Sequence, residues 1–226
     1  MPRITFDEVY DKSFESSNSN VEMRSALNTM WDNGVKVFEK LYGDKAHDVI
    51  KLCYEVSPRF CLHVVTVVYG LHWNWSDPSD YDKSLMTNLV LILDKSFNQF
   101  KVLMLTFLHS AQQMGKNGHT ILLAAIEYLS QNEWLSPEDK ATAEQLLKDD
   151  PSYTEDTNTE LSDEDLEITK LAVMTALKKD ADTVQLTKIF PLSKMQNLIF
   201  HANTYVGCPR VWDASSDANN HITAKL

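Results

Sequence analysis

Residues 80–114 carry the strongest apolar pattern in the chain, and that pattern limits what the remainder can fold into. Apolar side chains recur there at helical spacing. One face is marked by Leu85, Leu89, Ile92, Ser96, Phe100, Leu103 and Phe107, and it is widened by Met86, Val90, Leu93, Phe97, Met104 and Leu108. A helix that is apolar around most of its circumference has to be covered by other helices. The sequence therefore predicts an all-α, multi-helix globular bundle with a central apolar helix over about 80–114, surrounded by amphipathic helices.

The scarcity of glycine supports a helical fold. Only 6 of 226 residues are glycine, whereas a β-sandwich needs many glycine-containing turns. One segment, residues 60–75, is ambiguous, because its β-branched run from Val64 to Val68 also suits a buried strand. No partner strand is evident elsewhere, so we expect a buried helix, with a strand as the alternative.

Changes in composition predict how the chain is divided. A polar run at residues 16–20 closes an N-terminal tail, 1–20, which could dock through Ile4, Phe6, Val9, Tyr10 and Phe14. A main helical domain, 21–148, is followed by an acidic, apolar-poor linker, 149–161. A C-terminal helical part, 162–210, is packed on or tethered to the main domain and is expected to stop at Gly207-Cys208-Pro209, before a polar tail, 211–226.

The net charge is strongly negative and unevenly distributed. The chain has 32 acidic and 21 basic residues, and residues 138–167 alone hold twelve acids against Lys140 and Lys148. A negative field repels nucleic acid and anionic lipid, so we expect neither membrane insertion nor nucleic-acid binding by the whole surface. A local basic face is still conceivable in the near-neutral remainder, formed by Lys36, Lys40, Lys45, Lys51 and Arg59.

The cysteines and the N-terminus bear on the compartment. Cys53, Cys61 and Cys208 are odd in number and lack metal-type spacing, which is untypical of a disulfide framework. The first residues contain no apolar signal-peptide core. We therefore expect a cytoplasmic protein, with the nucleus as the alternative.

Residue types that carry chemistry do not form a recognisable constellation. His63, His72 and His109 are not spaced as metal ligands, and a Gly-x-Ser-x-Gly nucleophile motif is absent. Gly115 and Gly118 flank a lysine but lack the phosphate-loop spacing. The sequence therefore predicts no catalytic residue, no cofactor and no metal. An enzyme with a helical-bundle pocket near the three histidines is the second alternative.

An aromatic cluster offers a candidate for partner binding. Trp73 and Trp75 precede a break at Asp77-Pro78, and Tyr81 and Trp134 are possible neighbours. Tryptophan is enriched in binding hot spots. We expect a non-enzymatic helical interaction or scaffold protein that binds a protein partner or self-associates as an oligomer. The first alternative is a subunit of a larger assembly, including a virus-encoded one, that contacts nucleic acid through the local basic face.

Overall fold

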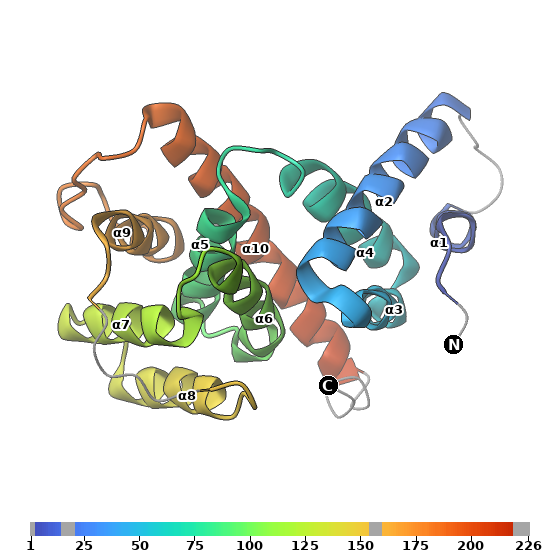
Figure 1. Ribbon diagram of the computed structural model, residues 1–226. Coiled ribbons are helices and arrows are strands. Elements are labelled where there is room, and N and C mark those ends of the chain that lie inside the picture. The colour runs from blue at the N-terminus through green and yellow to red at the C-terminus, as the bar shows by residue number, and fades with distance from the viewer. Residues whose placement is uncertain (1–2, 15–20, 154–159, 219–226) are drawn as a thin grey trace. The chain divides into compact units, whose positions relative to one another are not determined.

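The computed structural model describes residues 3–14, 21–153 and 160–218. Within these ranges the secondary structure is entirely helical, which confirms the all-α class (Figure 1). The chain divides into two compact units: Met1–Ser76 together with Arg210–Leu226, and Asp77–Pro209. The first boundary therefore lies inside the expected main domain, 21–148, and the expected linker, 149–161, lies inside the second unit, with residues 154–159 outside the described part.

The first unit is built from helices around an aromatic core. Its elements are α1 (Phe6–Ser13), α2 (Val21–Tyr42), a 3₁₀ turn η1 (Gly43–Lys45), α3 (Ala46–Val56), α4 (Pro58–His63) and η2 (Val64–His72). Phe38 lies at the centre, with its ring 4.0 Å from that of Tyr69, which in turn stacks on Trp73 at 5.7 Å. Tyr42 and Tyr69 share a buried hydroxyl–hydroxyl hydrogen bond of 2.7 Å.

The ambiguous segment 60–75 is helical, as expected, but most of it is a π-helix. Its wider turn is visible at the end, where the Trp73 amide donates to the carbonyl five residues back, on Val68, at 3.1 Å. Two glycines bring this helix against α2. An added Cβ on Gly34 would lie 1.9 Å from the Val65 carbonyl oxygen, and one on Gly70 would lie 2.1 Å from that of Met30. Only residues without a Cβ allow the two backbones to approach this closely.

The second unit contains α5 (Asp80–Leu93), α6 (Phe97–Gln113), α7 (Gly118–Gln131), α8 (Pro137–Lys148), α9 (Asp163–Leu177) and most of α10 (Leu192–Ala218). The expected single helix over 80–114 is wrong, because the chain breaks between α5 and α6. Lys95 adopts a left-handed conformation with φ of 60°, which an α-helix does not tolerate. The Ser96 amide donates to the Leu91 carbonyl at 2.9 Å and closes the end of α5.

Helix ends follow the sequence in two places and depart from it in a third. Ser136 and Ser162 cap α8 and α9 by accepting from the amides of Asp139 and Asp165, at 3.1 and 3.2 Å, as their Ser-x-x-Asp pattern indicates. The expected stop at residues 207–209 is wrong, because α10 continues to Ala218. A proline inside a helix removes one hydrogen bond and crowds the carbonyl one turn back, so a helix passes through it at a cost of about 3 kcal/mol or more.

Candidate functional site

The N-terminal helix α1 is docked on the first unit as a separate amphipathic element (Figure 1). Thr5 caps it by accepting from the Glu8 amide at 3.3 Å. Its buried residues follow one helical face, at spacings of three and four: Phe6, Val9, Tyr10 and Ser13. Of the five side chains that the sequence marked for docking, Phe6, Val9 and Tyr10 are buried, on a formed helix within the expected tail, whereas Ile4 is half-buried and Phe14 is exposed.

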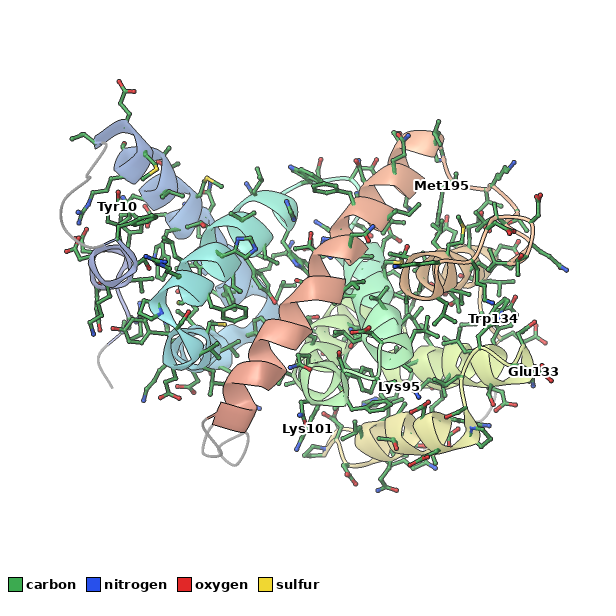
Figure 2. The ribbon with its side chains drawn as sticks, turned by 180° about the vertical axis from the view of Figure 1, so that it is seen from behind. Tyr10, Lys95, Lys101, Glu133, Trp134 and Met195 are labelled. Carbon is green, nitrogen blue, oxygen red and sulfur yellow. The ribbon has the colours of Figure 1, made fainter. Side chains whose placement is uncertain are left out.

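The groove that receives α1 is lined by α2, α3 and α4, and we call it the α1 groove. Its residues that contact α1 are Arg24 and Trp31 of α2, Tyr54 of α3 and Arg59 of α4. The Phe6 ring lies 6.1 Å from that of Trp31 in an edge arrangement, and Val9 is completely buried. Tyr10 lies on the side of α1 that faces α2 (Figure 2), and the Arg24 guanidinium stacks 4.7 Å from its ring.

A polar rim surrounds this apolar contact. Arg24 donates to Asp7 at 2.7 Å and to Asp11 at 3.0 Å, bridging two successive turns of α1. The hydrogen bond to Asp7 is the main cause that raises the pKa of Arg24. Because these carboxylates are largely exposed, the pairs contribute orientation more than binding energy.

The opposite rim is formed by Tyr54 and Arg59. The Tyr54 hydroxyl donates to Glu8 at 2.8 Å and accepts from Lys12 at 2.5 Å, which raises the pKa of Lys12. Arg59 donates from Nε to the Ser13 carbonyl at 2.8 Å, so a cation satisfies a carbonyl in the last turn of α1. An apolar stripe, a charged rim and a capped helix end are the features of helix-in-groove recognition.

The search found no matching protein family, no similar curated protein and no similar solved structure. The α1 groove therefore has to be interpreted from its own geometry.

The expected aromatic site is divided between the two units. Trp73 is 2% exposed within the first unit, and Trp75 is half-buried with its ring 5.4 Å from that of His72. Tyr81 and Trp134 belong to the second unit. Tyr81 is buried and donates to Asp165 at 2.7 Å, and Trp134 is half-buried with its ring 5.9 Å from that of Tyr128 (Figure 2). The two buried rings are core residues and offer no area to a partner.

The expected basic face carries as many acids as bases. Lys36, Lys40, Lys45 and Arg59 are exposed, and Lys51 pairs with Glu55 at 3.8 Å. The acidic residues in the same stretch, 32–59, are Asp32, Glu39, Asp44, Asp48 and Glu55. Five positive and five negative charges cancel over this surface, which does not favour a phosphate-binding patch.

The three histidines are divided between the two units. His63 and His72 lie in the first unit and His109 lies in the second, where its ring nitrogen is 3.0 Å from Gln113. Burial is the main cause that lowers the pKa of His72, and the nearby His63 lowers it further. Among the described residues, no three histidine, cysteine or carboxylate side chains are grouped closely enough to hold a metal ion.

The described residues also include a buried cysteine, and their helices can be compared with membrane-spanning ones. Burial raises the pKa of the Cys61 thiol to about 12, so this side chain is a core residue and a poor nucleophile. None of the described helices combines the length and apolar character that crossing a bilayer requires.

The sequence indicates the helix that occupies the α1 groove but does not indicate the residues that line the groove. The apolar residues of α1 are visible as a spaced set within a polar tail. Arg24, Trp31 and Tyr54 give no comparable signal, because each lies in an ordinary amphipathic helix and they are brought together only by folding. Helix-dipole logic could at most have marked Arg59 as a residue suited to a helix end.

Proposed function

We propose that this chain is a non-enzymatic protein-interaction module, and that the α1 groove binds an amphipathic helix. The observation that carries this proposal is that the groove already holds such a helix, α1, through an apolar stripe and a charged rim. The chain's own N-terminal segment thus shows the chemistry of the ligand that the groove accepts.

The expected ligand follows from these contacts. It is a short helix with large apolar residues at the spacing of Phe6, Val9 and Tyr10, and with carboxylates one turn apart at the positions of Asp7 and Asp11. Burying three such side chains yields roughly 5–8 kcal/mol before the costs of association. Association itself costs at least about 4 kcal/mol, so apolar burial leaves at most about 4 kcal/mol, which corresponds to a dissociation constant of about 1 mM or weaker.

A competition experiment on the full chain tests this function. Val9 is completely buried against the groove, so Val9→Glu should displace α1 from its own chain while leaving the groove intact. A fluorescently labelled peptide of residues 3–14 is titrated into the Val9→Glu chain and into the unmodified chain, and its polarisation is recorded. We expect saturable binding to the variant at millimolar concentrations and about twofold weaker binding to the unmodified chain, whose tethered helix competes at an effective concentration of about a millimolar.

The same peptide carrying Val9→Glu is the matched control and should not bind. If the unmodified peptide also fails to bind a Val9→Glu chain that circular dichroism shows to be folded, the groove is only an internal packing surface and the proposal is lost.

The two alternatives receive less support from the described residues. Nucleic-acid binding within a larger assembly lacks a surface of net positive charge, since bases and acids cancel over 32–59. A gel shift at low and moderate salt tests it, because phosphate contacts weaken steeply with salt. An enzyme centred on the three histidines would need His109 beside His63 and His72, which belong to a different unit. A scaffold role fits the cytoplasmic location that the cysteine content favours.

A further inference from the structure

We propose that the partner helix is α1 of a second copy, so that two chains exchange their N-terminal helices and form a dimer. This inference rests on the proposed function of the α1 groove and names its ligand. An exchanged helix makes the contacts of the resident one, so the exchange needs no new complementarity within the groove.

The connection between α1 and α2 is suited to such an exchange. Residues 15–20 read Glu-Ser-Ser-Asn-Ser-Asn and contribute no apolar side chain. The described contacts that hold α1 are made by residues 6–13, through Phe6, Asp7, Glu8, Asp11 and Ser13 among others. Its docking is therefore encoded in the helix itself, and the same helix can dock wherever an equivalent groove is within reach.

Apolar side chains at both ends of this connection supply a second observation. Phe14 is 37% exposed, Val21 is 76% exposed and Met23 is 38% exposed when α1 docks on its own chain. Among the residues of the first unit whose side chains are described, Leu71 is the other large apolar residue that is exposed. The seven residues from Phe14 to Val21 extend no further than about 25 Å, so an exchanged helix stays within that distance of the start of its own α2. A dimer in which the two sets of ends meet would cover apolar area that is exposed in the single chain.

Reversing the charges of the groove in one chain and of the helix in another tests the exchange. Only an exchange of helices between the two chains restores the pairing of opposite charges. One full-length variant carries Arg24→Asp, and the other carries Asp7→Lys with Asp11→Lys. In each variant alone, the rim of the groove meets a helix of like charge. In an equimolar mixture, each helix finds the opposite charge only on the other chain. All three positions are at least one-third exposed, so the substitutions leave the core unchanged.

We expect each variant to be monomeric and the mixture to double its mass in light scattering at low ionic strength. The 1:1 dimer should dissociate near 1 M salt, where charge pairs are screened beyond about 3 Å. As the matched control, Lys36→Asp replaces Arg24→Asp in the mixture. Lys36 is an exposed lysine on the same helix, and we expect no dimer that contains both chains, because the Lys36→Asp chain keeps Arg24 and repels the lysine-bearing helix.

Two outcomes would overturn the exchange. The first is a mixture that stays monomeric at about 1 mM, where the other chain is as concentrated as a tethered helix. The second is that either variant dimerises by itself, since association would then use another surface. If the mixture stays monomeric but the peptide of residues 3–14 binds, the groove retains its proposed function and only the identity of its partner is refuted. If the peptide also fails, both proposals are refuted.

Discussion

The closest backbone contact of the first unit makes a sharp prediction about stability. Gly70 of η2 faces the Met30 carbonyl of α2, and a Cβ added at position 70 would lie 2.1 Å from that oxygen and 3.1 Å from the Val65 carbonyl oxygen. Both neighbours are backbone atoms, so no side chain can rotate away. The two helices would have to separate by about an ångström to restore an ordinary van der Waals distance.

The magnitude follows from two opposing effects. Overpacking a well-packed contact costs about 1–3 kcal/mol and sometimes more, whereas alanine gains about 1 kcal/mol over glycine in helix propensity. Because the obstacle is backbone and the separation would loosen Phe38 against Tyr69, we place Gly70→Ala at the upper end of that range. The expected net loss in free energy of unfolding is about 2 kcal/mol.

Urea denaturation followed by tryptophan fluorescence measures this loss, because Trp31, Trp73 and Trp75 belong to the first unit. The matched control is Gly43→Asn. Gly43 has φ of +54° and no atom within 4 Å of an added Cβ, and asparagine tolerates that conformation. We expect the control to unfold within about 0.5 kcal/mol of the unmodified chain. A Gly70→Ala variant as stable as the control would show that α2 and η2 do not depend on this close approach.

Three further predictions address other contacts. Tyr10→Phe should leave stability unchanged or raise it by up to about 1 kcal/mol in thermal unfolding, because the buried Tyr10 hydroxyl has no hydrogen-bond partner among the described residues; a loss above 1 kcal/mol would mean that the hydroxyl is bonded. Burial lowers the pKa of His72, so as the pH falls this histidine is protonated in the unfolded chain at a higher pH than in the folded chain. The first unit should therefore lose stability as the pH falls below 6.5. In urea melts at pH 7.5 and 5.5, His72→Gln should reduce this pH dependence. Cys61, with a pKa of about 12, should resist iodoacetamide in the native chain at pH 8 and react in 8 M urea, as peptide mass spectrometry would show; rapid native alkylation would contradict its burial.

The starts of two helices follow signals that lie within a few residues of sequence. The helix break at Lys95 and the π-helix over Val64–His72 do not, because the apolar pattern gives no sign of them. Ser136 and Ser162 do cap α8 and α9, and the signal is local, because serine is a favoured N-cap residue and acids follow it in the first turn. The break at Lys95 was missed because the apolar spacing continues across it, since α5 and α6 each present apolar residues to the same unit. The π-helical form of Val64–His72 was hidden for a related reason, as an uninterrupted apolar run has no period to measure.

The acidic residues show why charge counted along a sequence overstates the field that a partner would meet. Of the twelve acids in 138–167, Asp139, Asp150, Asp165 and Glu167 are buried. Each holds a specific contact within the second unit: Asp139 pairs with Lys95 at 2.9 Å, Asp150 lies 3.5 Å from His119, and Asp165 lies 3.5 Å from Lys116. Glu167 accepts from the backbone amides of Thr187 and Lys188 at 2.9 and 2.6 Å.

These carboxylates tie helices and loops together, and their charge is largely matched by the groups they contact. The acids that the structure leaves exposed in this region are Glu138, Asp149, Glu160, Asp163 and Glu164. Electrostatic steering of a basic partner therefore depends on a smaller set than the sequence suggests. The α1 groove, in contrast, sets its charges at defined positions beside an apolar stripe, and that combination of burial and orientation is what specific recognition requires.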